Sequence, residues 1–208
     1  MNIAILNIKG EDTGRKAKLN DEVFKIEPND HSIYLDVKQY LAKQRQGTHK
    51  SKERADIVGS TKKVKKQKGT GTARMGSVKS PILRGGGRAF GPKPRDYGFK
   101  LNKKVKVLAR KSALSYKVLE KELMIIENFN FDNPKTKSYL ELLNSLSLTD
   151  KKTLMVIPVS DKNIVLSGRN IPKTKISLAS DINTYDVLNA ERLILCEGSI
   201  EKIENILN

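Results

Sequence analysis

Residues 153–157 read Thr-Leu-Met-Val-Ile, a continuous run of β-forming apolar side chains. Such a run is typical of a strand that is buried on both faces of a parallel sheet. Residues 123–126, Leu-Met-Ile-Ile, form a second run of this kind. Between the two runs, Asn133-Pro134 opens a helix with Pro in its first turn. The apolar face of this helix is formed by Tyr139, Leu142, Leu143 and Leu146.

The alternation of strand and helix continues to the C-terminus. We expect a short helix over residues 161–167, a third strand over 176–179, a helical turn over 185–189, a fourth strand over 193–196 and a terminal helix over 199–207. This order implies right-handed crossovers in a layered domain. The predicted fold class is therefore α/β, a layered domain with a mostly parallel sheet of about four strands flanked by helices.

The N-terminal residues contribute smaller elements. We expect a short strand over residues 3–8, turns around Gly10 and Gly14, and a small extended piece over 22–26. Pro28-Asn29-Asp30 then supplies capping chemistry for a helix that ends near Gly47. The helical spacing of its apolar side chains marks one face, which consists of Ile33, Val37, Tyr40 and Leu41.

Positive charge is concentrated in the middle of the chain. The sequence has 40 Lys and Arg against 23 Asp and Glu, and residues 57–95 contain no acidic residue at all. Ten of the 14 glycines lie between residues 47 and 98, so no apolar core can form there. We therefore expect a single globular α/β domain over residues 1–46 and 100–208, with residues 47–99 as an extended basic RNA-binding loop inserted in it. Such a loop should be mobile alone and ordered by a partner, as a hairpin or as an irregular coil.

The helix expected after the basic loop also carries one-sided charge. Over residues 101–119, Val105, Leu108, Tyr116 and Leu119 share one face, whereas Lys103, Lys106, Arg110 and Lys117 share the opposite face. A solvated charged stripe is the simpler interpretation. The absence of acidic residues from 97 to 119 favours a helix that faces phosphates.

Several classes of function are excluded by what the chain lacks. No apolar run approaches the length of a membrane span and no basic segment precedes the N-terminal apolar residues, so a cytoplasmic location is expected. Cys196 lies in an apolar run and should be a buried, inert thiol. His31 and His49 lack metal-site spacing, and the glycines at 69–76 and 85–91 match neither dinucleotide nor P-loop fingerprints. We therefore expect no catalytic residues, no metal and no cofactor.

Nucleic-acid binding fits the residues of the basic loop. Its cations can neutralise phosphates, its glycines allow close approach of the backbone, and Phe90, Tyr97 and Phe99 offer stacking faces. A basic tail without specificity is the alternative, but the mixture of turn formers, aromatics and threonines argues against it. The side chains expected to bind RNA are Lys50, Lys52, Lys62, Lys63, Lys65, Lys66, Lys68, Arg74, Lys79, Arg84, Arg88, Lys93, Arg95, Lys103, Lys106 and Arg110.

The loop sequence closely resembles that of the bacterial large-subunit ribosomal protein four family. The resemblance is carried by residues 67–74 (Gln-Lys-Gly-Thr-Gly-Thr-Ala-Arg), 84–87 (Arg-Gly-Gly-Gly), 90–97 (Phe-Gly-Pro-Lys-Pro-Arg-Asp-Tyr) and 103–105 (Lys-Lys-Val). Matches at residues 45–50, 185–190 and 197–198 extend it over essentially the whole chain.

The resemblance implies a structural constituent of the large ribosomal subunit, ribosome-bound, that binds large-subunit (23S-type) ribosomal RNA. In that family the loop tip lines the nascent-peptide exit tunnel beside ribosomal protein number twenty-two. Some relatives also bind their own operon leader mRNA. The residues carried over to the tip are Gln67, Lys68, Gly69, Thr70, Gly71, Thr72, Ala73 and Arg74, with Lys68 at the position associated with macrolide sensitivity.

The sequence departs from the family pattern at two places. Thr72 stands where the family usually has Arg, and the chain contains no Trp where a Pro-Trp pair commonly precedes the tip. An RNA-modifying enzyme or a free nucleic-acid-binding regulator remain the alternatives. Neither a cofactor fingerprint nor a helix-turn-helix pattern supports them.

Overall fold

The computed structural model describes all 208 residues of the chain. They divide into two compact units. We call the first, Met1–Leu41 together with Lys100–Asn208, the α/β domain, and the second, Ala42–Phe99, the basic arm.

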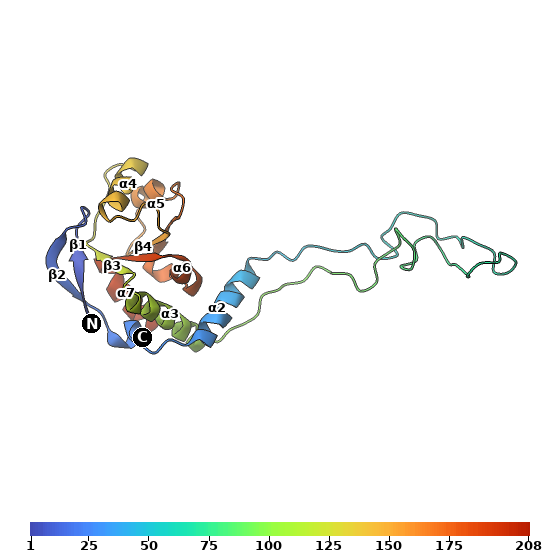
Figure 1. The fold of residues 1–208 in the computed structure, drawn as a ribbon, viewed down its shortest axis with the longest axis horizontal. Helices are drawn as coiled ribbons and strands as arrows, with labels where there is room; N and C mark the ends of the chain where they lie inside the picture. The colour runs from blue at the N-terminus through green and yellow to red at the C-terminus, as the bar shows by residue number, and fades with distance from the viewer. The chain divides into compact units, whose positions relative to one another are not determined.

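The α/β domain contains one six-stranded sheet with strand order β2-β1-β3-β6-β4-β5. Figure 1 shows the antiparallel pair β1 and β2 at one side of this domain. Five strands are parallel, and only the edge strand β2 runs antiparallel to its neighbour. The strands are β1 (Asn2–Leu6), β2 (Asp12–Lys18), β3 (Leu123–Ile126), β4 (Thr153–Ile157), β5 (Thr174–Leu178) and β6 (Arg192–Cys196).

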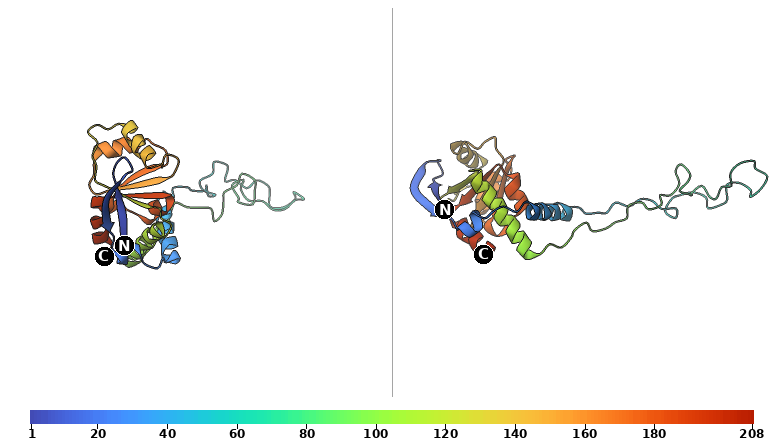
Figure 2. Two further views of the ribbon diagram at one scale, coloured as in Figure 1. Left: turned by 60° about the vertical axis from the view of Figure 1, so that its left-hand side comes forward. Right: turned by 60° about the horizontal axis from the view of Figure 1, so that its bottom comes forward.

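Helices cover both faces of this sheet, and the two cores follow from the alternation of side chains along each strand (Figure 2). Leu154 and Val156 of β4 belong to the core under α1, α3, α6 and α7, whereas Met155 and Ile157 belong to the core under α4 and α5. The helices are α1 (Asp21–Phe24), α2 (Asp30–Lys43), α3 (Lys103–Leu119), α4 (Thr136–Ser145), α5 (Lys162–Gly168), α6 (Thr184–Asn189) and α7 (Glu197–Leu207), with a 3₁₀ turn η1 at Ala179–Asp181.

The predicted α/β class and mostly parallel sheet are confirmed, although the sheet has six strands rather than about four. The buried runs at 123–126 and 153–157 are strands at those same residues. The missed strand is β2, Asp-Thr-Gly-Arg-Lys-Ala-Lys, which has almost no apolar signal because it is a solvated edge. It pairs with β1 from Asn2 to Leu6, and the strand expected to reach residue 8 ends earlier. Asn7 ends it, since its side-chain oxygen accepts from the amides of Lys9 and Glu11, both at 2.9 Å.

The extended piece expected over residues 22–26 is wrong. Residues 21–24 form the single helical turn α1, because the Asn20 side chain caps it by accepting from the amide of Glu22 at 3.0 Å. Val23 and Phe24 are fully buried in this turn. The prediction failed because two adjacent apolar residues fit a strand and a helical turn equally well.

The buried faces of α2 and α3 also differ from those expected. In α3, Leu108 and Leu119 are exposed, and the small residues Ala109, Ser112 and Ala113 are buried together with Leu114. The Ser112 hydroxyl accepts from the amide of Asn29 at 3.1 Å, so α3 packs closely against the loop between α1 and α2. Because a helical wheel predicts burial from apolar side chains, it does not predict the burial of a serine that bonds to a neighbouring backbone amide.

Lys117 was expected on the charged face of α3 and is instead buried. Its ammonium group pairs with Glu122 at 2.5 Å. In α2, Ser32, Asp36 and Gln39 are the buried residues, and Leu41 is exposed. Polar side chains are therefore part of the buried surface of both helices, and in α3 they lie beside the apolar core residues Ala113 and Leu114.

Two helix boundaries also need correction. α2 ends at Lys43 and not near Gly47. α4 begins at Thr136 after the cap residue Lys135, so Pro134 precedes the helix and does not lie in its first turn. A proline disfavours helical backbone angles at the residue before it, and Asn133, which precedes Pro134, lies in a bend.

The buried hydrogen bond between α2 and α6 is open to test. The Thr184 hydroxyl, 1 % exposed, donates to Asp36 at 2.6 Å. Thr184→Val should lower the free energy of unfolding by about 1–3 kcal/mol, because it leaves a buried carboxylate without this donor. Urea denaturation measures the change. The matched control is Thr149→Val, which removes an exposed hydroxyl bonded to Asn144 and should have little effect; equal losses in the two variants would contradict the assignment.

Candidate nucleic-acid interface

Within the basic arm, two limbs of the chain run side by side without regular helix or strand. Isolated backbone hydrogen bonds of 2.9–3.1 Å join the limbs. They run from Arg95 N to Gly47 O, from Ser51 N to Pro92 O, from Arg88 N to Lys52 O and from Val64 N to Gly76 O. Of the two conformations that the sequence left open, an extended hairpin and an irregular coil, the arm has the irregular backbone of a coil, and isolated hydrogen bonds pair its limbs as in a hairpin.

An aromatic cluster holds the start of the arm together. The guanidinium groups of Arg45 and Arg95 lie 3.7 and 4.7 Å from the centroid of the Tyr97 ring. The Tyr97 hydroxyl is 2.9 Å from His49 Nε2. Gly47, at φ +64°, is required here, since a Cβ atom would lie 2.0 Å from the carbonyl oxygen of Arg95. Sequence reasoning assigned Arg95 to RNA and did not foresee this cluster.

Residues 51–56 and 77–93 form a second contact region, which we call the hub. A Cβ atom on Gly87 would lie 2.3 Å from the amide nitrogen of Arg54, so the limbs touch through their backbones. The Arg54 guanidinium donates to the buried hydroxyl of Ser77 at 3.1 Å. The hub is thus held by backbone proximity and polar contacts in place of an apolar core. Neither Arg54 nor Ser77 was singled out from the sequence, because the distance between them along the chain hides their contact.

The acidic residues of the arm are all engaged inside it. Glu53 pairs with Lys93 at 2.7 Å, and this hydrogen bond raises the pKa of the lysine. Asp56 accepts from the amide of Glu53 and pairs with Lys50 at 3.1 Å, and these contacts lower the pKa of its carboxyl group. Asp96 accepts from the amide of Gly98 at 2.7 Å. Glu53 and Asp56 are thus paired with lysines, and Asp96, which is bonded to a neutral amide, is the one carboxylate left to oppose the other cations of the arm.

Most arm cations predicted to bind RNA are exposed. Lys65 and Lys79 are half-buried. The exposed ones are Lys50, Lys52, Lys62, Lys63, Lys66, Lys68, Arg74, Arg84, Arg88, Lys93 and Arg95. The arm therefore presents a dense positive surface, apart from the two lysines that pair with Glu53 and Asp56.

The remaining three predicted residues lie on α3 in the other unit. Lys103 is exposed, and Lys106 and Arg110 are half-buried. The Nε atom of Arg110 is buried without a hydrogen-bond partner. This helix is expected to face phosphates, and an unsatisfied guanidinium nitrogen is compatible with that role.

The tip of the arm, residues 64–76, is closed by the hydrogen bond between Val64 and Gly76. Gly69 and Gly71 have φ angles of +80° and +60°, which reverse the chain. No atom lies within 4 Å of a Cβ placed on either glycine. Lys65 donates to the Thr72 hydroxyl at 2.8 Å, and Lys63 donates to Gln67. The tip is thus a local turn with open surroundings.

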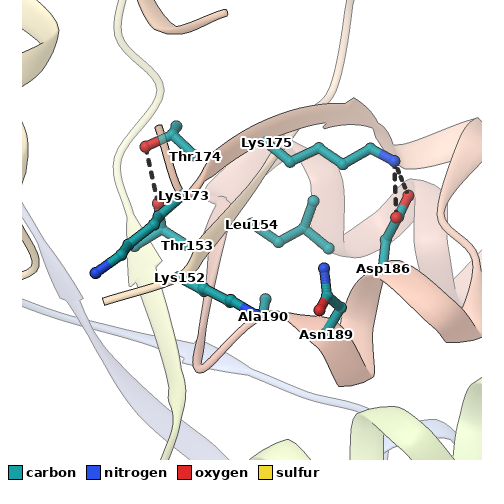
Figure 3. Close-up of a pocket in the computed structure, with 9 residues that line it drawn as sticks. All are labelled: Lys152, Thr153, Leu154, Lys173, Thr174, Lys175, Asp186, Asn189 and Ala190. Carbon is teal, nitrogen blue, oxygen red and sulfur yellow. Dashed lines mark hydrogen bonds and ion pairs between the residues drawn. The ribbon is translucent and has the colours of Figure 1, made fainter. Parts of the chain in front are cut away.

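A pocket of about 290 Å³ lies at the amino ends of β4 and β5 in the α/β domain (Figure 3). Three lysines line it, but Lys175 is paired with Asp186 at 2.6 Å and Lys173 donates to the carbonyl of Asp150 at 3.0 Å. Its two threonines, Thr153 and Thr174, bond to each other at 3.4 Å. Most of the polar side chains that line the pocket are thus already bonded within the protein and are not arranged around a substrate.

Other candidate reactive groups have structural roles. Burial raises the pKa of the Cys196 thiol to about 12, as expected for an inert cysteine. Asp161 caps α5 by accepting from the amide of Asn163 at 2.8 Å. No cluster of His, Cys, Asp and Glu side chains could hold a metal ion, and no helix has the length and apolarity to cross a bilayer.

The fold and the arm together define a class of protein, an α/β domain with a glycine-rich basic extension inserted in it. Comparison with known sequences makes the class more specific. The family model described as ribosomal protein L4/L1 family matches residues 17–206. The chain belongs to this family, whose members are structural ribosomal proteins and not enzymes.

Curated relatives support the same assignment along the whole chain. The protein "Large ribosomal subunit protein uL4" of Christiangramia forsetii is 62% identical over 208 residues, with 100% of both chains covered. The proteins of the same name from Phocaeicola vulgatus and Cytophaga hutchinsonii are each 61% identical, again with 100% coverage of both chains. The chain is a ribosomal protein of the large subunit.

Close backbone contact in the hub generates a prediction. Gly87→Ala should force the limbs apart, because the added Cβ would overlap the backbone of Arg54, and overpacking costs about 1–3 kcal/mol. Amide hydrogen exchange at Arg88 and Ser51, which donate across the limbs, should accelerate by roughly 5- to 150-fold. Gly76→Ala is the control, since its Cβ would meet no atom within 4 Å. Unchanged exchange in the Gly87 variant would show that the hub is not closed in solution.

Proposed function

We propose that the basic arm binds large-subunit ribosomal RNA, as the resemblance implies. The observation that carries this proposal is the shortage of acids in the arm: Glu53 and Asp56 are paired with lysines, and Asp96 alone cannot balance the exposed lysines and arginines that remain. A polyanion supplies that countercharge, and neutralising its phosphates releases condensed counterions. The RNA contacts are assigned to the arm cations together with Lys103, Lys106 and Arg110 of α3.

We assign residues 67–74 to the narrow part of the nascent-peptide exit tunnel, beside ribosomal protein number twenty-two. The open surroundings of Gly69 and Gly71 support a tip that meets other molecules with its backbone. The missing arginine at position 72 has a local substitute, because the Lys65 ammonium group lies at the Thr72 hydroxyl. Lys65 thus brings a cation to the place where relatives usually have one.

The RNA-binding proposal is tested by salt dependence. With eight to ten phosphates contacted, the affinity of the full chain for large-subunit RNA should fall by about 10³–10⁵ between 50 and 200 mM salt. Replacing Lys62, Lys63, Lys65 and Lys66 by Gln should reduce the slope of log K against log salt by about 3–4. Filter binding with a large-subunit RNA transcript measures both.

The control for this experiment replaces four exposed lysines of the α/β domain, Lys135, Lys137, Lys151 and Lys162, by Gln. It changes the net charge equally and should leave the slope nearly unchanged. A shallow slope in the wild type, or equal effects of the two sets, would contradict binding through the arm.

The tunnel assignment is tested with a thiol probe. Because Cys196 is buried and its pKa is raised to about 12, a cysteine introduced by Thr70→Cys is the reactive thiol of the chain. In assembled large subunits it should cross-link to a nascent peptide that carries a maleimide. Thr149→Cys, on an exposed turn of the α/β domain, is the control and should not react. Reaction at the control alone would place the tip elsewhere.

A further inference from the structure

Phe90 has an unusual position in the hub. Its side chain is fully exposed, and its φ angle is +51°, in the left-handed region that bulky residues seldom adopt. A phenylalanine exposed to water gains nothing from burial, and a glycine would fit this backbone better. Neither folding nor solubility accounts for it, so the ring is expected to serve an external contact.

The hydrogen bonds of the hub explain how the ring is displayed. Arg88 N donates to Lys52 O at 2.9 Å, and Ser51 N donates to Pro92 O at 3.0 Å. Ser51 and Lys52 are adjacent, whereas Arg88 and Pro92 are separated by three residues, so residues 89–91 bulge out between two fixed points. Gly91 keeps the bulge against the opposite limb, because a Cβ there would lie 2.5 Å from the Cβ of Ser51. Phe90 is the central residue of this bulge.

The charges around the bulge select the kind of partner. Arg84 and Arg88 are exposed on the same hub, and its two carboxylates are already paired with Lys50 and Lys93. A protein pocket would have to desolvate these unopposed guanidinium groups, whereas RNA neutralises them with phosphates. RNA also offers the ring a partner, because the unstacked bases of RNA loops and bulges stack on exposed aromatic side chains.

We propose that Phe90 stacks on an unpaired base of large-subunit ribosomal RNA, so that the hub contributes a stacking contact in addition to charge. The inference rests on the proposed RNA binding and adds one residue and one kind of contact to it. Arg84 and Arg88 hold the flanking phosphates, and the bulge fixes the ring before the RNA arrives.

The first experiment measures RNA binding by full-length variants at one salt concentration. Phe90→Leu removes the ring and keeps an apolar side chain, and it should weaken binding to the large-subunit RNA transcript by roughly 5- to 150-fold. Phe90→Tyr keeps the ring and should bind within about twofold of the wild type. The matched control is Ile82→Ala, which removes an equally exposed apolar side chain of the hub and should also have little effect.

A second experiment reports directly on the ring. Because the chain contains no Trp, Phe90→Trp introduces a single Trp, whose emission can be excited selectively at wavelengths that the six tyrosines do not absorb. Stacking should quench its emission on addition of the RNA and protect it from iodide. Ile82→Trp provides the comparison and should remain accessible to iodide.

The outcomes separate this inference from the proposed function. If the wild type binds RNA with a steep salt dependence while Phe90→Leu binds equally well, stacking is overturned and charge-driven binding stands. If the Phe90→Trp fluorophore stays accessible to iodide when the variant is bound to the RNA, the ring does not stack on a base and the inference is wrong. If the wild type does not bind the RNA, both are overturned.

Discussion

Mutual repulsion among the cations of the arm constrains the rest of its structure. Between Ile57 and Arg95 the chain carries lysines and arginines without a single acid, and it has too few apolar groups to offset their repulsion by burial. The limbs stay together because glycines allow backbone contact and because Glu53 pairs with Lys93 of the opposite limb, whereas Asp56 pairs with Lys50 of its own limb. These two acids are too few to neutralise the arm. The excess positive charge is what remains for a polyanion.

The two units of the chain are stabilised by different physical means. In the α/β domain, strands such as β4 are buried on both faces, and each fully buried apolar side chain contributes about 1.5–3 kcal/mol. In the arm, the contacts are single backbone hydrogen bonds, cation–π contacts around Tyr97 and exposed ion pairs, each of which contributes less than the burial of an apolar side chain because water competes for the same groups. Local opening should therefore be far easier in the arm, and this difference leaves its surface adaptable to a large, irregular partner.

The sequence was informative where a single side-chain property decides the structure. Continuous apolar runs located the parallel strands, and the density of charge and glycine located the arm. The sequence did not predict which residues are buried where polar side chains form buried hydrogen bonds, or where a strand lies at the solvent-exposed edge of the sheet. Ser112 accepts from Asn29, Asp36 accepts from Thr184, and β2 is polar along its length, so periodicity assigned the wrong faces to α2 and α3 and missed the edge strand. The contact between Arg54 and Ser77 spans 23 residues and has no local signal.

Glycine has two distinct roles in the arm, and they explain why its parts differ in adaptability. At Gly47 and Gly87 any side chain would collide with the opposite limb, so these glycines hold the limbs together. At Gly69 and Gly71 the surroundings are empty, and only the positive φ favours glycine. The close backbone contacts therefore favour a closed hub, while the tip retains conformational freedom that a partner must remove at an entropic cost. We therefore expect the hub to position the arm on its partner and the tip to adapt its backbone to the partner's surface.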